Sequence, residues 1–241
     1  LEAYSQHLDF ELTAGQHQAC LDLIESCAKP YPMNRLLQGD VGSGKTVVAA
    51  FALLLAQQNQ HQGALLVPTE ILAKQHYKNL RKVFSAMNLS LGLLTSSTPT
   101  AKREKMLAEL KQGKLQTLIG THALLSEDVQ FKNLAVLVVD EQHKFGVHQR
   151  TRLLKANPRP HYLVMTATPI PRTLALTVYG DLEFSLIREL PKGRQPIKTY
   201  WITRKKQKQV LEHILEKVQK GEQAYFIFPL IEETEKSDLL A

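Results

Sequence analysis

Residues 39–46 form a pattern that could bind the phosphates of a nucleotide. Its glycines would let the backbone turn so that several N–H groups point at one phosphate, and a helix beginning at Lys45 would add its positive end. Lys45 is expected to reach the β- and γ-phosphates, and the hydroxyl of Thr46 to bind Mg²⁺. An apolar segment before the pattern and an apolar helical segment after it favour this interpretation over a glycine-rich turn that only caps a helix. The predicted nucleotide-binding residues are Gly39, Asp40, Val41, Gly42, Ser43, Gly44, Lys45 and Thr46.

Two adjacent carboxylates follow the continuous apolar segment Val136–Val139. A phosphate-binding loop needs a second protein group to orient Mg²⁺, and Asp140 is the candidate for this role. Glu141 is the candidate base that orients the attacking water. A strand end with two solvated acids would explain this pair equally well if it stood alone. The phosphate-binding pattern elsewhere in the same chain favours the catalytic interpretation.

The elements that would position these residues alternate along the chain between short apolar segments and longer helical ones. Strands that are apolar throughout are buried on both faces. The sequence therefore predicts an α/β fold with a mostly parallel sheet, helices on both faces and, given the phosphate-binding pattern, nucleotide at the carboxyl ends of its strands. The expected strands are Arg35–Gln38, Ala64–Val67, Leu91–Leu94, Thr117–Ile119, Val136–Val139 and His161–Met165, and the expected helices are Thr46–Gln58, Ile71–Met87 and Thr100–Gln112.

A second domain is expected to begin after a linker. Residues 191–197 contain helix- and strand-breaking residues without periodicity, so they are predicted to join a lobe over 1–190 to the start of another over 198–241. That start comprises an expected strand Lys198–Ile202, a helix Arg204–Gly221 and an apolar segment Ala224–Leu230. These residues are too few for a well-buried core of their own, and the sequence begins with Leu1, so we expect a fragment.

The composition indicates an ordinary globular protein that attracts polyanions. It has 44% apolar and 22% charged residues, a net charge of +7 and a pI of about 9.3. Cys20 and Cys27 are expected to be reduced thiols, because two helical turns separate them. We find neither a bilayer-spanning apolar segment nor a secretory signal, which predicts a cytoplasmic protein without a membrane partner.

Several motifs together give the chain a resemblance to superfamily-two helicases. Asp140-Glu141-Gln142-His143 resembles their D-E-x-H box, and Met165-Thr166-Ala167-Thr168-Pro169 resembles their S/T-A-T box. The longer segments 33–46 and 166–173 resemble RecG-type branched-DNA helicases and their relatives, the transcription-repair coupling factors. The segments 179–182 and 189–199 favour the RecG type. The resemblance covers the chain from Phe10 to its end. It implies a P-loop NTPase (RecA-like) fold, with ATP and Mg²⁺ as cofactors.

The resemblance also implies roles for residues outside the phosphate-binding pattern. The segment from Phe10 to Gln16 is similar to the Q-motif, in which the glutamine meets the adenine edge and the aromatic ring packs nearby. Thr13 and Gln16 also form a capping-box pattern, and both roles can hold. The resemblance implies that His143, Thr166 and Thr168 couple the ATP state to the grip on DNA. A buried histidine and ordinary threonines at a strand end are the alternatives.

Three segments are implied to contact nucleic acid, each after an apolar strand. They would bind backbone phosphates without reading sequence, and N-capping by Thr69 and Thr121 is the alternative. The contact at Thr95 is the weakest of them, because relatives generally carry glycine where Ser96 stands. The residues concerned are Pro68, Thr69, Thr95, Gly120, Thr121 and His122.

The resemblance predicts an ATP-dependent DNA helicase or translocase lobe that acts on forks and Holliday junctions in recombination and repair. The wedge domain and the second-lobe arginine finger of such proteins have no counterpart in this sequence, so we expect the chain alone to bind ATP–Mg²⁺ and hydrolyse it poorly. A transcription-repair coupling translocase, an RNA helicase and a nucleotide-gated binding module without turnover are the alternatives.

Overall fold

The computed structural model describes residues 1–141, 145, 153–154, 158–168, 182–189, 197–203 and 206–227. The chain divides into two compact units, residues 1–194 and residues 195–241. His143, one of the predicted coupling residues, lies outside the described residues.

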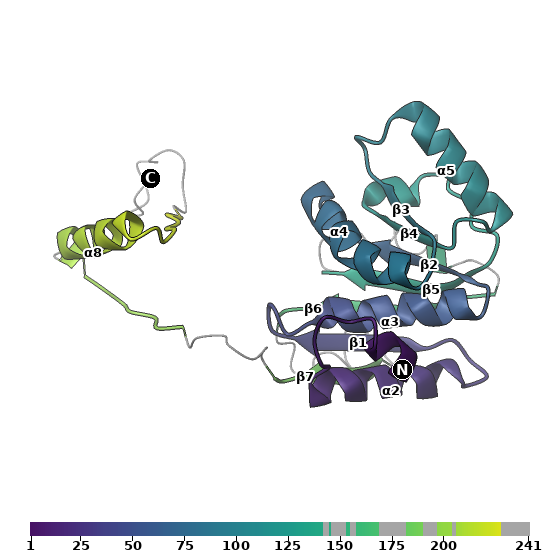
Figure 1. The fold of residues 1–241 in the computed structure, drawn as a ribbon, viewed down its shortest axis with the longest axis horizontal. Coiled ribbons are helices and arrows are strands. Elements are labelled where there is room, and N and C mark those ends of the chain that lie inside the picture. Colours follow the sequence, from purple (N-terminus) through teal and green to yellow (C-terminus); the bar gives the residue numbers. More distant parts are fainter. Residues whose placement is uncertain are drawn as a thin grey trace, which may run out of the picture. The chain divides into compact units, whose positions relative to one another are not determined.

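A seven-stranded sheet forms the centre of the first unit, with the strand order β3-β4-β2-β5-β6-β1-β7. All of its neighbouring strands are parallel, and Figure 1 shows them in this order from top to bottom. The α/β fold with a parallel sheet is therefore confirmed. The strands are β1 (Asn34–Gly39), β2 (Gln62–Leu66), β3 (Leu91–Leu94), β4 (Thr117–Gly120), β5 (Leu134–Asp140), β6 (His161–Thr166) and β7 (Glu183–Ile187).

Helices cover both faces of this sheet. Consecutive residues of a strand point to opposite faces, so neighbouring residues pack against different helices. Leu37 of β1 packs into the core that includes residues of α2 (Ala14–Cys27), α3 (Lys45–Gln58) and α4 (Glu70–Ala86). Its neighbour Leu36 packs into a second core with residues of α5 (Thr100–Gln112) and the 3₁₀ helix η1 (His122–Leu125). The short helix α1 (Glu2–Ser5) packs on α3, where Tyr4 donates a 2.8 Å hydrogen bond to the carbonyl of Val47.

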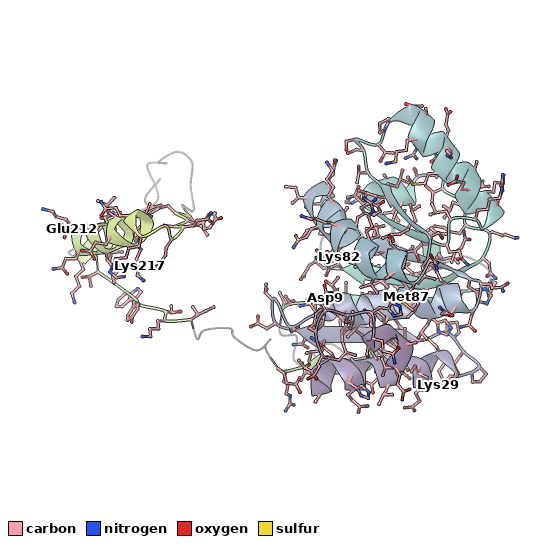
Figure 2. The ribbon with its side chains drawn as sticks, viewed as in Figure 1. Asp9, Lys29, Lys82, Met87, Glu212 and Lys217 are labelled. Carbon is pink, nitrogen blue, oxygen red and sulfur yellow. The ribbon has the colours of Figure 1, made fainter. Side chains whose placement is uncertain are left out.

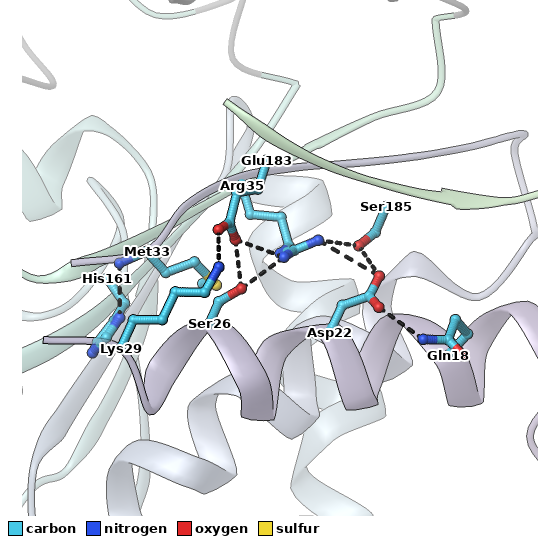
Figure 3. Close-up of polar contacts among 9 residues, drawn as sticks. All are labelled: Gln18, Asp22, Ser26, Lys29, Met33, Arg35, His161, Glu183 and Ser185. Atoms are coloured by element: carbon cyan, nitrogen blue, oxygen red, sulfur yellow. Dashed lines mark hydrogen bonds and ion pairs between the residues drawn. The ribbon is translucent and has the colours of Figure 1, made fainter. Parts of the chain in front are cut away.

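A network of charged side chains ties β7 and α2 to β1. The guanidinium of Arg35 on β1 lies between the carboxylates of Glu183 on β7 and Asp22 on α2, at 2.6 and 3.5 Å (Figure 3). Arg35 also donates to the hydroxyls of Ser26 and Ser185, at 2.6 and 2.7 Å. Burial alone would raise the pKa of Glu183, but hydrogen bonds from Lys29 and Ser26 and the charge of Arg35 hold it below its usual value. The network therefore fixes α2, whose first turn carries Gln16, against the strand that leads into the phosphate-binding loop.

The second unit differs from its expectation. The segment Lys198–Ile202 forms no strand, because a strand needs a neighbour to satisfy its backbone groups and none of the described residues offers one. The expected helix is present as α8 (Gln207–Gln219), and residues 222–227 have no regular structure. An ion pair between Lys217 and Glu222, 2.9 Å, follows its last turn, and Figure 2 labels Lys217. The assignment of this unit to a second lobe stays a prediction.

None of the helices in the described ranges has both the length and the apolar composition that crossing a bilayer would require. Both cysteines are free, Cys20 buried and Cys27 partly buried. Burial raises the pKa of Cys20 to about 12 and that of Cys27 to about 11, so neither thiol forms a thiolate readily.

Candidate active site

The phosphate-binding loop runs from the end of β1 to the start of α3. Gly42 and Gly44 adopt φ angles of 79° and 87°, in the left-handed region that favours glycine. A Cβ atom on Gly44 would also collide with the side chain of Gln16. The amine of Lys45 donates to the carbonyls of Gly39 and Asp40, at 2.6 and 3.0 Å, and so lies across the loop. The buried hydroxyl of Ser43 makes no hydrogen bond to any described residue.

Three carboxylates act on the Lys45 amine. Burial lowers the pKa of Lys45, while the charges of Asp140, Glu141 and Asp40 act in the opposite direction. The strand register explains why Asp140 can act on a residue of this loop. Asp140 on β5 is level with Met165 on β6, and Met165 is level with Leu37 on β1. The two predicted catalytic carboxylates and the loop therefore share the carboxyl edge of the sheet.

Glu141 is held against the end of β6. Its backbone N–H donates to the carbonyl of Met165 at 3.0 Å, and its φ of 48° is left-handed. Its carboxylate accepts from the N–H of Ala167 at 3.1 Å and lies 3.5 Å from the hydroxyl of Thr166. The hydroxyl of Thr166 is in turn 2.7 Å from that of Thr168. The predicted base therefore contacts one predicted coupling threonine, Thr166, directly and the other, Thr168, through Thr166.

Gln16 fastens the start of α2 to the loop. Its carbonyl oxygen accepts from the N–H of Thr13 at 3.0 Å, and the hydroxyl of Thr13 accepts from the N–H of Gln16 at 3.3 Å, so the capping box is formed. Its amide nitrogen donates to the carbonyl of Ser43 at 2.8 Å. Phe10, half exposed, lines a cavity of about 580 Å³ that Thr46 also lines. Asp9 belongs to the same lining, and Figure 2 labels it.

The three segments implied to contact nucleic acid follow β2, β4 and β3, neighbouring strands on the other side of β5. The hydroxyl of Thr69 accepts from the N–H of Leu72 at 3.3 Å, so Thr69 caps α4 as the alternative predicted. Thr121 is the N-cap residue of η1, but its side chain makes no such bond. A Cβ atom on Gly120 would collide with the carbonyl of Leu94, so glycine permits the close approach of β4 to β3. His122 is exposed, and its ring lies 5.0 Å from that of Phe145.

Thr95 faces inward. It is buried, its hydroxyl lies 3.1 Å from that of Ser97, and its N–H donates to Thr98 at 2.9 Å. The exposed hydroxyls of this turn belong to Ser96 and Ser97, and both donate to the carboxylate of Glu70 in the first turn of α4. Hydrogen bonds from Lys74 and Ser97 hold the pKa of Glu70 below its usual value.

One residue at the site has no counterpart among the sequence predictions. His76 of α4 is buried, and its Nε2 lies 3.1 Å from Oδ2 of Asp140. In the sequence His76 follows Ala73 and precedes Leu80 on the buried stripe of α4, so its spacing indicates only a core position. A histidine among apolar residues is visible in the sequence. The sequence does not indicate that this histidine contacts the end of β5.

The fold and this arrangement define a P-loop motor lobe, and comparison with known families agrees. Residues 13–177 match the model of the DEAD/DEAH box helicase family, so the chain belongs to that family and contains a nucleotide-binding domain. The chain is 54% identical over 241 residues to the ATP-dependent DNA helicase RecG of Synechocystis sp., covering 100% of the chain and 29% of the relative. It is 47% identical over 239 residues to RecG of Bacillus subtilis, covering 99% of the chain and 35% of the relative.

Solved structures give the same result. A structure of RecG bound to a three-way DNA junction matches with a TM-score of 0.84 and 41% identity, over 95% of this chain and 31% of that one. The DUF1998 helicase MrfA matches with a TM-score of 0.62 and 19% identity, over 93% of this chain and 41% of that one, which shows the fold alone. The similarity to RecG-type helicases that the motifs indicated is therefore confirmed.

Proposed function

We propose that this chain is the ATP-binding lobe of an ATP-dependent DNA helicase or translocase that remodels branched DNA, such as forks and Holliday junctions, in recombination and repair. The main support is the joining of Glu141 to the Thr166–Thr168 segment beside the phosphate-binding loop. It occurs in a chain 54% and 47% identical to two RecG helicases. The related structure of RecG is bound to a three-way DNA junction, which supports branched DNA as the substrate.

The residues at this edge fit ATP and Mg²⁺. No group of three or more His, Cys, Asp or Glu side chains able to hold a metal occurs among the described residues. A Mg²⁺ site in a nucleotide-binding lobe needs fewer protein groups, because phosphates and water complete its coordination. The hydroxyl of Thr46 and the carboxylate of Asp140 are the proposed ligands. Bound there, Mg²⁺ supplies positive charge against the β- and γ-phosphate oxygens.

The catalytic steps follow from the groups of this chain. We assign Lys45 to the γ-phosphate, which its amine reaches by leaving the carbonyls of Gly39 and Asp40. Glu141 orients water and receives its proton. The N–H of Ala167 and the hydroxyl of Thr166 hold the Glu141 carboxylate, so a shift of the Thr166–Thr168 segment would move the base. His143 is assigned to the same coupling on the resemblance alone.

Gln16 and Phe10 are proposed to meet the adenine. The amide nitrogen of Gln16 has a second N–H beyond the one that donates to Ser43, and this group would meet the edge of the base. The aromatic ring of Phe10 would pack beside it from the rim of the cavity that Thr46 also lines. Gln16 would then report the presence of the base to the phosphate-binding loop.

The ends of β2, β3 and β4 are proposed to follow the DNA backbone. Pro68 and Thr69 follow β2, which is the neighbour of β5, and β5 ends in Asp140. Gly120, Thr121 and His122 come next, and Thr95 supports the outermost turn from within. A second lobe, beginning after residues 191–197 and supplying an arginine finger, would complete the motor together with an N-terminal wedge domain. We also propose that the protein is cytoplasmic, because both of its cysteines are free thiols.

ATP hydrolysis by the full-length polypeptide encoded by the gene tests this function. We would compare a model fork, linear duplex, single-stranded DNA and RNA at one stated salt concentration, because phosphate contacts weaken steeply with salt. We expect the strongest stimulation by the fork and its loss in Lys45→Ala. Equal stimulation by linear duplex would favour a repair-coupling translocase, and stimulation by RNA alone would contradict the DNA assignment.

A further inference from the structure

His76 makes a contact that neither the resemblance nor the proposed catalytic steps require. It lies on α4, and its Nε2 is 3.1 Å from Oδ2 of Asp140 at the end of β5. Both side chains are largely buried, with exposures of 9% and 13%. An ionised carboxylate only accepts hydrogen bonds, so Nε2 of His76 is the donor whenever Asp140 is charged.

The other ring nitrogen of His76 indicates what the contact costs. Nδ1 is buried and has no partner among the described residues. A buried polar atom without a partner reduces stability, and an apolar side chain at this core position would avoid that cost. Histidine, unlike an apolar side chain, makes the hydrogen bond to Asp140. It leaves Oδ1 of the carboxylate as the oxygen free of this bond.

Helix α4 links this contact to the proposed DNA-binding edge. Thr69 caps the helix, and Glu70 in its first turn accepts hydrogen bonds from Ser96 and Ser97 at the end of β3. His76 lies seven residues after Thr69, which corresponds to about 10 Å along a helix. A continuous helix therefore connects the hydroxyls of two proposed nucleic-acid segments to the carboxylate proposed to hold Mg²⁺.

We propose that His76 is a positioning residue that holds Asp140 in the orientation that binds Mg²⁺ and thereby connects the DNA-facing start of α4 to the metal site. This inference rests on the proposed nucleotide site. Groups that hydrogen-bond a metal ligand orient it, and their removal typically lowers metal affinity about 10- to 100-fold. A displacement of α4 by DNA would move the donor and with it the carboxylate.

The test compares His76→Leu and His76→Gln in the full-length polypeptide. Glutamine can place an amide N–H near the position of Nε2, whereas leucine fills the space without a donor. The measurement is the Mg²⁺ concentration at half-saturation for binding a fluorescent ATP analogue, together with binding of the same analogue in EDTA. Gln57→Leu is the matched control, because Gln57 is a buried residue of α3 that hydrogen-bonds Thr117 and the Ser90 carbonyl.

We expect His76→Leu to raise the half-saturating Mg²⁺ concentration about 10-fold or more. Binding in EDTA should stay at the wild-type level, and His76→Gln should recover part of the Mg²⁺ affinity. In steady-state hydrolysis with DNA, His76→Leu should lower kcat at a fixed Mg²⁺ concentration. The kcat of this variant should recover when the Mg²⁺ concentration is raised. Gln57→Leu should lower the melting temperature without changing the Mg²⁺ dependence.

An unchanged Mg²⁺ dependence in His76→Leu would overturn the inference. So would an equal loss of binding with and without Mg²⁺, because that pattern belongs to a structural role. A failure of the proposed function is separate from both results, since the wild-type protein would then show no Mg²⁺-dependent binding of the analogue.

Discussion

Burial disfavours the positive charge of the Lys45 amine. Burial lowers its pKa despite the three nearby carboxylates, so the folded state holds the Lys45 proton less tightly than the unfolded state does. The unfolded state therefore binds more protons between the lowered pKa and the ordinary value, and stability rises with pH across that window. Below that window the cost of the buried charge is fully present.

Lys45→Met should therefore not lower the stability of the nucleotide-free protein at neutral pH. The methionine keeps the length of the stem and removes the desolvated charge, so we expect an equal or greater denaturation midpoint. The rise in melting temperature that ATP–Mg²⁺ gives the wild type should disappear, because binding energy adds directly to stability. Urea denaturation and thermal shift check both parts, and a destabilised variant that still responds to ATP would contradict them.

At the same scale, the sequence predicted that the loop and the carboxylates of Asp140 and Glu141 lie at one edge of the sheet, but not the contacts that hold them there. The loop glycines and Lys45 are recognisable because phosphate binding restricts residue type at each position. The contacts of Glu141 with Ala167 and of His76 with Asp140 join segments distant in sequence. No local pattern encodes such pairs. His143 falls outside the described residues, so its coupling role stays a prediction.

At the scale of the elements, Arg35 holds the edge strand β7 against the rest of the sheet. It bridges β1 to β7 and α2 through Glu183 and Asp22. Arg35→Met would leave the partly buried carboxylate of Asp22 without this cation and Glu183 with Lys29 as its remaining one. We expect a loss of about 3 kcal/mol in the free energy of unfolding.

Arg103→Met is the matched control for this prediction. Arg103 binds Asp128 at 2.7 Å, but the Asp128 side chain is 51% exposed. An exposed pair of this kind contributes below about 1 kcal/mol. Chemical denaturation of both variants makes the comparison, and equal losses would show that the Arg35 network has no special role in holding β7.

Element prediction succeeded where one physical signal dominated. The helix Thr100–Gln112 and the strand Leu91–Leu94 have the bounds expected from their periodicity and apolar runs. The strand β7 was missed because Glu183 and Ser185 interrupt its apolar pattern, and both of them serve Arg35. The expected strand Lys198–Ile202 was wrong because β-propensity alone cannot supply a neighbouring strand.

Over the whole molecule, the two units have different amounts of core. In the unit of residues 1–194, both faces of the sheet are covered by buried side chains. In the other unit, Trp201 and Ile227 are 94% and 92% exposed, and α8 contains no buried residue. The length of the segment after the linker predicted this contrast, because so short a segment cannot enclose a core.

We propose above that one edge of the sheet binds ATP–Mg²⁺ and that Glu141 activates water there. The most direct test is Glu141→Gln in the full-length polypeptide, with fork DNA present. Glutamine keeps the shape and a carbonyl acceptor for the N–H of Ala167 but has no basic carboxylate. We predict wild-type affinity for ATP–Mg²⁺ and a loss of at least about 100-fold in single-turnover hydrolysis. A variant that binds ATP–Mg²⁺ and hydrolyses it at the wild-type rate would contradict this account.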